Sequence, residues 1–411
     1  MAEAAVALRA RKGSEASRSW RTAAYLTSAV VHNLPDFDFL YTGITGGSLG
    51  YLLHHRGHSH TVVVASALGL LALAVVAVVA RRRKFGWSRS DFGWLFGLCW
   101  FGPLVHIAMD FTNNYGVHPF WPLYDGWIYG DAIFIVEPYF WAIGIPPLIF
   151  AAEARTTKSI YALFLVLGVG LCWLVSVKDS PWGVRLIPPP MALGVTIAAG
   201  VVTVGSWHAD PRTRIAVGVL GSWAVAVIFF VASLKAKRAV LGSSLLTGAW
   251  VHDVVVTPMP ANPLCFSALV IQTRGGHYVV SRATVATIPG MLPAERCPVD
   301  TGQDTTAPLA GSWDSEAPGI RWRGEFSAPL EQLVALARDQ CEAAALLRFL
   351  RVPYWIESAT EQYIVGDLRY DRAPGLDFSD VALSARSSAC PRAVPPWIPP
   401  RRDLLELREG P

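Results

Sequence analysis

The sequence predicts an all-α polytopic membrane domain of about seven helices, followed by a small soluble α+β domain. Composition favours this fold class, because hydrophobic residues make up 52% of the chain and charged residues only 16%. Soluble domains carry about a quarter charged residues. The position of the apolar stretches favours it as well, since seven long ones precede residue 239 and none follows it. A chain of 411 residues has room for both domains.

Each apolar stretch approaches the roughly 20 residues that a transmembrane helix needs. The seven are residues 23–40, 61–80, 92–109, 132–151, 160–177, 187–206 and 215–234. We expect a membrane domain over residues 22–238, preceded by a basic segment, residues 1–21, that lacks the apolar core of a signal peptide. The first stretch is the weakest because it ends in a proline and two carboxylates. Such a segment is tolerated only where it lines protein or water.

The distribution of lysine and arginine predicts how the helices are oriented. The side that holds the N-terminal segment carries 14 of these residues in its loops, and the opposite side carries 6. The basic run at residues 81–84 is the strongest indication that the first side is cytoplasmic. Basic residues at 235–238 argue the other way. With the side that carries more lysine and arginine in the cytoplasm, the ends of the first and third stretches and the start of the second lie at the periplasm or cell exterior.

Histidines and aspartates gather at this outer end of the first three stretches. Asp36 and Asp38 end the first stretch, histidines at positions 54, 55, 58 and 60 precede the second, and His106 and Asp110 end the third. Such groups stay in a bilayer only when they pair with each other, a metal or a substrate. Because neighbouring antiparallel helices bring these ends to one face, the sequence predicts a metal centre there.

The residue types indicate which ion such a centre would hold. His106 and Asp110 are separated by four residues, so on a helix both project from one face. Mixed histidine and aspartate ligands suit zinc, manganese or iron better than calcium. The predicted metal ligands are Asp36, His55, His60, His106 and Asp110. The predicted catalytic residues are Asp38, Arg56 and Asp131. A carboxylate would act as base toward a metal-activated water, and Arg56 would bind an anionic substrate oxygen.

Simpler roles stay open for several of these residues. His106 and Asp110 can satisfy each other through a hydrogen bond within the helix, and Asp36 can cap the helix after Pro35. Asp131 can be a solvated loop charge. For two further histidines, His54 and His58, we expect a surface position rather than a role as ligand.

The order of these motifs resembles the YdjM-type family of bacterial membrane-bound, metal-dependent hydrolases. The motifs are Leu-Pro-Asp-x-Asp at 34–38, His-Arg-Gly-x-x-His at 55–60, His-x-x-x-Asp at 106–110, and Asn113 with Tyr115-Gly116. The resemblance implies a hydrolase of the bacterial inner membrane. It also implies that residues 257–263 are a Pro-rich junction ahead of the soluble part. Two features depart from the family: no Thr-His pair opens the first helix, and Glu137-Pro138 stands in place of Asp-Pro.

From residue 239 to residue 393 we expect the soluble α+β domain. Alternating runs at 266–273 and 277–281, separated by Gly275-Gly276, predict a β-hairpin. Residues 328–350 have helical spacing, and residues 363–370 read as a strand. Four cysteines in this part allow one or two disulfides, with the pairing open: Cys265, Cys297, Cys341 and Cys390. The Pro-rich tail, residues 394–411, is expected to be extended and disordered.

Three classes of function fit these observations. The first is a metal-dependent hydrolase that acts on phosphoester or lipid-linked substrates at the membrane surface. The second is a metal or proton transporter, which would need ligands near mid-bilayer and an internal repeat. The third is a non-catalytic membrane scaffold with a structural metal. The expected partners are the lipid bilayer and a small-molecule or lipid substrate. The net charge of +4 is spread over loops and gives no reason to expect nucleic acid. The oligomeric state stays open.

Overall fold

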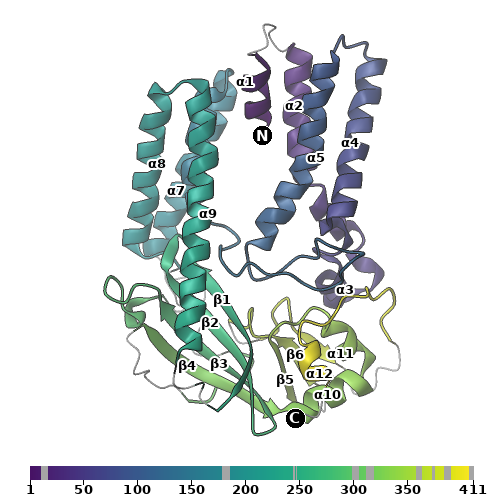
Figure 1. Ribbon diagram of the computed structural model, residues 1–411, viewed down its shortest axis with the longest axis vertical. Coiled ribbons are helices and arrows are strands. Elements are labelled where there is room, and N and C mark those ends of the chain that lie inside the picture. Colours follow the sequence, from purple (N-terminus) through teal and green to yellow (C-terminus); the bar gives the residue numbers. More distant parts are fainter. Residues whose placement is uncertain are drawn as a thin grey trace.

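The computed structural model describes residues 1–10, 17–177, 186–243, 246, 248–298, 305–311, 319–357, 363–372, 375–383 and 390–406. Helices fill one half of the molecule, and two antiparallel sheets with short helices fill the other half (Figure 1). The predicted fold class, an all-α membrane domain followed by a small α+β domain, is confirmed.

Five helices of the described chain are long and apolar enough to cross a membrane. They are α4 (Val62–Arg82), α5 (Arg89–Phe111), α7 (Arg155–Val177), α8 (Pro189–His208) and α9 (Pro211–Leu241). The other two predicted spans correspond to shorter helices, α2 (Arg18–Val31) and α6 (Pro138–Ala151). A further short helix, α1 (Ala2–Ala10), precedes them. The prediction of about seven helices is therefore roughly right, although two of them fall short of full spanning length.

The second half of the first predicted span is a different structure. Pro35 has no N–H for an α-helical hydrogen bond, and it begins a 3₁₀ segment, η1 (Pro35–Leu40). Helix α2 therefore ends at Val31, and the chain reaches η1 with both aspartates at the membrane end of the helices.

The spanning helices form two groups. Helices α2, α4 and α5 pack together, and α6 packs against α7, α8 and α9. Gly69 permits the close approach of α4 to α5, because a Cβ at this position would lie 2.1 Å from the carbonyl oxygen of Cys99. At the start of α5, Ser88 and Asp91 form a capping box, and Asp91 also pairs with Arg9 of α1.

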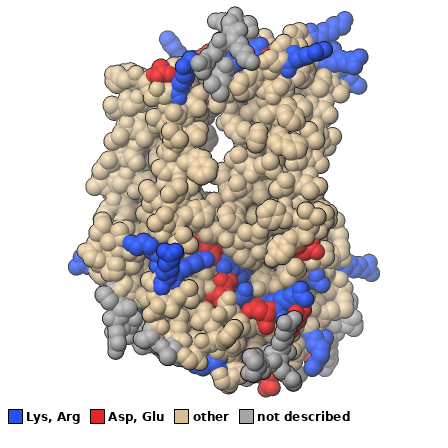
Figure 2. All heavy atoms as spheres, in the orientation of Figure 1, with Lys and Arg blue, Asp and Glu red and all other residues tan. Residues whose placement is uncertain are grey.

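Charged residues mark the two ends of an apolar belt. Figure 2 shows lysine and arginine at the end farthest from the sheets, an uncharged middle zone, and charges of both signs toward the sheets. The basic run at residues 81–84 lies at the first end, at the end of α4. Four of the counted basic residues, Arg11, Lys12, Lys178 and Arg185, fall outside the described residues.

The soluble part contains two sheets. The first has the order β1 (Trp250–Met259), β2 (Asn262–Arg274), β3 (His277–Ala286) and β4 (Ile320–Pro329). The second has the order β5 (Pro353–Glu357), β6 (Tyr363–Asp367) and β7 (Val381–Leu383). The short helices are η5 (Ala294–Arg296), α10 (Leu330–Asp339), α11 (Cys341–Leu346) and α12 (Arg402–Leu405). The last turns of α9 pack on the first sheet, where Ala236 and Val240 contact the same core as Phe266.

Most predictions for this part agree with the structure, and three need correction. The β-hairpin is confirmed as β2–β3, with Gly275 and Gly276 both at positive φ. The predicted helix at 328–350 is two helices that meet at Gln340. The supposed Pro-rich junction at 257–263 is instead the end of β1, a tight turn and the start of β2. The described part of the tail, residues 394–406, is not disordered: it includes α12, and Trp397 is fully buried and donates a hydrogen bond to the Leu53 carbonyl.

Both disulfides lie in this soluble part. Cys265 pairs with Cys297, and Cys341 pairs with Cys390. Cys99 and Cys172 of the spanning helices are free and buried. Disulfides persist in oxidising compartments. They therefore agree with the orientation predicted from the positive charges.

This orientation predicts how the thiols respond to reagents that cannot cross the membrane. On intact cells or spheroplasts, an impermeant maleimide should label the protein only after an impermeant reductant has opened the two disulfides. Variants with Cys265→Ser and Cys297→Ser, or with Cys341→Ser and Cys390→Ser, should each lose about half of that label. Labelling that requires lysis would place the sheets in the cytoplasm.

Candidate metal centre

Three chain segments bring the candidate ligands together at the membrane end next to the sheets. Asp36 lies in η1, and His60 ends a short 3₁₀ segment, η3 (His58–His60). His106 and Asp110 lie in the last two turns of α5. Helix α3 (Gly47–His54) connects η1 to η3 and turns the chain back toward α4.

The four side chains offer one ligand atom each, and all four atoms lie within 4.8 Å of one another. His60 Nε2 lies 3.4 Å from Asp36 Oδ1 and 3.1 Å from Asp110 Oδ2. His106 Nε2 lies 3.3 Å from each of the same two oxygens. Donors bound tetrahedrally to zinc at about 2.0 Å are separated by about 3.3 Å. These four distances therefore have the size of the edges of a tetrahedral metal site.

Unpaired atoms support the same interpretation. His60 Nε2, His106 Nε2 and Asp110 Oδ2 are buried and have no hydrogen-bond partner. Buried polar atoms are normally paired. Three unpaired atoms this close together therefore indicate a position for a metal ion. The alternative, a pair of His106 with Asp110 within the helix, would join two of these atoms, which lie 3.3 Å apart, but that pair alone leaves out His60 Nε2. Asp36 lies inside η1 and caps no helix, since the N-cap position there is Leu34.

Electrostatics favours a cation at this point. Burial lowers the pKa of His60, but contacts with Asp110, Asp36 and Asp38 outweigh it and raise the pKa to about 10. The surrounding carboxylates therefore attract positive charge strongly. A divalent ion would supply that charge in place of the proton and would leave Nε2 free to bind it.

Asp38 is fully buried and organises the segment that carries His60. It accepts hydrogen bonds from His55 Nδ1 at 3.1 Å, from the Arg56 backbone N–H at 2.8 Å and from the Ser59 hydroxyl at 3.2 Å. His60 Nδ1 lies 3.3 Å from the second carboxylate oxygen. Burial raises the pKa of Asp38, but these contacts prevail and hold it at about 2. A carboxylate behind a histidine is the arrangement that fixes the tautomer of a metal ligand.

Arg56 connects the ligands to the rest of the site. Its guanidinium contacts Asp110 Oδ1 at 2.8 Å and donates to Asn113 Oδ1 at 3.0 Å. It also lies over the Tyr115 ring, 4.8 Å from the ring centre. Asp110 is therefore held through one oxygen, while the other oxygen faces the histidines. Arg56 has a φ of 57°, an unusual backbone conformation that the hydrogen bond to Asp38 secures.

The structure separates the eight predicted site residues into four groups. Four of the predicted ligands form the cluster: Asp36, His60, His106 and Asp110. Asp38 and Arg56 lie directly behind it. His55, predicted as a ligand, is not among the four grouped donors, and its Nδ1 donates to Asp38. Asp131, predicted as catalytic, lies in a separate network of ion pairs. His54, expected at the surface, is buried, with Nε2 2.6 Å from the Thr45 hydroxyl.

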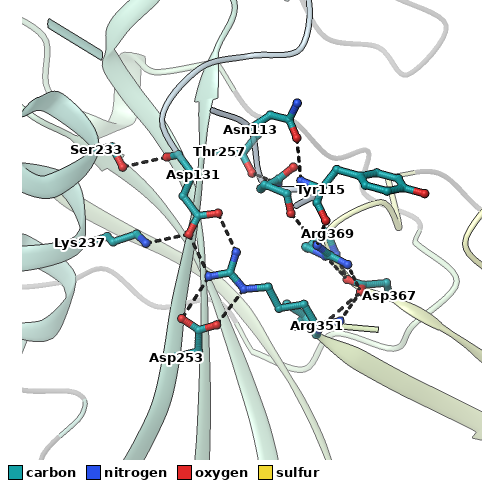
Figure 3. A network of polar contacts seen from close by, with 12 residues as sticks. Asn113, Tyr115, Asp131, Ser233, Lys237, Asp253, Thr257, Arg351, Asp367 and Arg369 are labelled. Carbon is teal, nitrogen blue, oxygen red and sulfur yellow. Dashed lines mark hydrogen bonds and ion pairs between the residues drawn. The ribbon is translucent and has the colours of Figure 1, made fainter. Parts of the chain in front are cut away.

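Figure 3 shows the network around Asp131, which joins the helices to the sheets. Its carboxylate accepts two hydrogen bonds from Arg351, at 2.7 and 2.9 Å, and one from Lys237 of α9 at 2.7 Å. Arg351 also contacts Asp253 of β1 at 2.8 Å. These charges neutralise one another within the interface, so Asp131 has no free oxygen aimed at the metal cluster.

A second part of this network holds the loop after α5. Arg369 donates to the backbone oxygens of Asn114 and Tyr115, and Asp367 fixes its guanidinium (Figure 3). Tyr115 and Trp127 belong to the same hydrophobic core as Phe349 and Leu350 of the soluble part. Sequence reasoning missed Arg351 and Arg369, which lie more than 200 residues from Asp131 and from the backbone of Asn114, respectively. No local motif marks such a pair.

Comparison with known proteins adds one finding. The family model described as YdjM inner membrane protein matches residues 1–180 of this chain. That range contains all four residues of the cluster. No curated protein and no solved structure matches the chain. The family match and the five helices of spanning length identify a multi-pass inner membrane protein.

The geometry predicts which substitutions release a metal. Purified wild-type protein, reconstituted with zinc and then dialysed, should retain about one equivalent. His60→Ala and a His106→Ala/Asp110→Ala double variant should lose it, because each removes cluster donors. His54→Ala is the matched control and should retain the ion. Elemental analysis by mass spectrometry measures the content. Equal content in wild type and both cluster variants would contradict the assignment.

The interface network makes a different prediction for Asp131. Breaking one side of a buried ion pair costs about 3–5 kcal/mol, so Asp131→Ala should lower the thermal unfolding midpoint clearly. Its metal content should equal that of the wild type. Arg338→Ala, at an exposed pair with Asp339, should leave the midpoint nearly unchanged. Loss of metal from folded Asp131→Ala protein would contradict this prediction and would show that Asp131 contributes to metal binding.

Proposed function

We propose that this chain, whose residues 1–180 belong to the YdjM inner membrane protein family, is a metal-dependent hydrolase. The observation that carries the proposal is the close grouping of four histidine and aspartate donor atoms within 4.8 Å of one another, three of them buried and without a hydrogen-bond partner. Zinc fits this donor set best, because it favours tetrahedral nitrogen and oxygen ligands, and manganese or iron are the alternatives. Bound there, such an ion supplies Lewis acidity and lowers the pKa of water toward neutrality.

The burial of the four ligands is uneven, and this favours a reactive site over a purely structural one. The Asp36 side chain is 45% exposed, whereas those of His106 and Asp110 are 16% exposed and that of His60 is fully buried. Structural zinc sites are closed, whereas catalytic ones keep or gain an open position. Asp36 is the ligand that can give way to water or substrate without disturbing a packed core.

The residues behind the cluster have separable tasks. Asp38 holds the proton of His60 on Nδ1, so that Nε2 keeps its lone pair for the cluster. Arg56 orients Asp110 through one terminal nitrogen, and the Nε of Arg56 has no hydrogen-bond partner. That N–H can stabilise negative charge that develops on a substrate oxygen.

His55 is suited to move a proton. Its Nδ1 donates to Asp38, and its ring stacks on Tyr51. A histidine held by a carboxylate in this way can act as general acid toward a leaving group. We therefore assign His55 to proton transfer rather than to metal binding.

The two other classes of function lack comparable support. A transporter that works by alternating access would place its ligands near mid-bilayer, whereas these ligands lie at the helix ends, next to the sheets. A structural metal would not need a half-exposed ligand. The substrate that fits the location is a phosphoester or lipid-linked molecule at the membrane surface.

The hydrolase proposal predicts graded losses of activity. Zinc-loaded protein should hydrolyse a phosphodiester probe such as bis(p-nitrophenyl) phosphate, or a short-chain phospholipid. Asp38→Asn should lower kcat/KM by about 10- to 100-fold, the usual effect of losing a carboxylate behind a ligand. His55→Gln should lower kcat and change its pH dependence while the metal stays bound. Full metal occupancy without turnover of any phosphoester would leave a structural metal instead.

A further inference from the structure

A cavity of about 480 Å³ lies beside the metal centre, between the helical part and the sheets. Its wall includes His55 and Arg56 on the metal side, and Ile135 from the loop before α6. The soluble part contributes Tyr370, Arg372 and Phe378. Arg56 also contacts the ligand Asp110, so a molecule in the cavity is one side chain away from the cluster.

Several residues that line the cavity have hydrogen-bond donors without a partner. Four buried atoms of lining residues have no hydrogen-bond partner: Arg56 Nε, Tyr115 Oη, Tyr370 Oη and Arg372 Nε. The two guanidinium atoms can only donate, and hydroxyls can donate as well. Burial raises the pKa of Tyr370 to about 12 and that of Tyr115 well above its ordinary value, so both phenols keep their protons. These four atoms therefore remain available as donors to a ligand.

The charges in the wall favour an anion. Among the described residues, Arg372 has no ion pair, whereas Arg56 is paired through Asp110. The wall also contains one carboxylate, Asp377, but one of its oxygens accepts the Phe378 backbone N–H. Two arginines and two tyrosines with unpaired donor atoms line a volume that suits a phosphate with its substituent, because phosphate offers several acceptor oxygens.

One side of the cavity is apolar and continues toward the membrane. Ile133, Phe134 and Ile135 line it and directly precede α6. Ile135 is 64% exposed. On the opposite side, Phe378 contacts the rings of Tyr51 and Tyr370, with centroid distances of 6.5 and 4.7 Å. The cavity thus has a polar interior, an aromatic wall and an apolar edge.

We infer that this cavity binds the phosphate-bearing headgroup of an anionic amphiphile, with Arg372 of the soluble domain as the anchor and the apolar chain along Ile133–Ile135. The inference rests on the proposed function, since it names the substrate class of the same site. It assigns a role to the soluble domain, which supplies a substrate-binding residue that the helical part lacks.

Binding of a non-hydrolysable ligand tests this without turnover. The probe is the phosphonate analogue of dihexanoyl phosphatidic acid, titrated calorimetrically into zinc-loaded full-length protein in detergent. Wild type should bind the phosphonate at least about tenfold more tightly than inorganic phosphate. Arg372→Gln should weaken both ligands by about tenfold. Ile135→Asp should weaken only the amphiphile, because inorganic phosphate has no chain to place there.

Control variants guard against a general loss of structure. Arg338→Gln, an exposed arginine on α10, should bind as the wild type does. Tyr370→Phe removes one donor without changing shape, and it should weaken the phosphonate even if Arg372→Gln folds poorly. Metal content and unfolding midpoint are measured for each variant.

The outcomes distinguish this inference from the proposed function. Unchanged binding in Arg372→Gln and Tyr370→Phe would overturn the cavity assignment, whether or not the protein hydrolyses phosphoesters. Equal affinity for the amphiphile in wild type and Ile135→Asp would mean a site for free phosphate and would also overturn it. Binding that depends on Arg372, found with no hydrolysis by the wild type, would uphold the cavity and reject the hydrolase.

Discussion

The carboxylate of Asp38 is fully buried at the end of an apolar helical domain, and the local structure of the site follows from the need to satisfy it. A buried charge without partners costs several kcal/mol. Asp38 therefore gathers the Arg56 backbone N–H, the His55 and His60 rings and the Ser59 hydroxyl around itself. These contacts fix the bend between α3 and α4, and they leave the outer nitrogen of His60 facing Asp110. The spacing of the cluster thus depends on a residue that is not itself one of its four donors.

The soluble domain stabilises the other half of the site. The loop after α5 carries Asn113, which holds Arg56, and Tyr115, which lies under it. Arg369 binds the backbone of this loop, and Arg351 binds Asp131 at its far end. Because the same loop shares a hydrophobic core with the sheets, metal centre and soluble domain form one packed unit. This explains how a domain without its own catalytic cluster can shape the cavity.

Much of this arrangement could be predicted from the sequence, for a physical reason. Polar residues at one end of consecutive apolar helices have little to pair with except each other, so the sequence alone groups Asp36, His60, His106 and Asp110. His55 and His60 could not be told apart, since both present Nδ1 to Asp38 and the difference lies in where Nε2 is placed; that of His60 lies 3.1 Å from Asp110. Asp131 looked like a site residue because its partner Arg351 is 220 positions away. Strand β4 was missed for a similar reason, as its partner β3 is distant from it in the sequence.

X-ray absorption at the zinc edge, on reconstituted full-length protein, tests the central claim most directly. The claim is that two histidines and two aspartates bind one ion tetrahedrally. The account predicts a first shell of nitrogen and oxygen atoms only, about four in number at about 2.0 Å, with the multiple-scattering signature of two imidazoles. A first shell of six oxygens, the presence of sulfur, or the absence of imidazole scattering would contradict it.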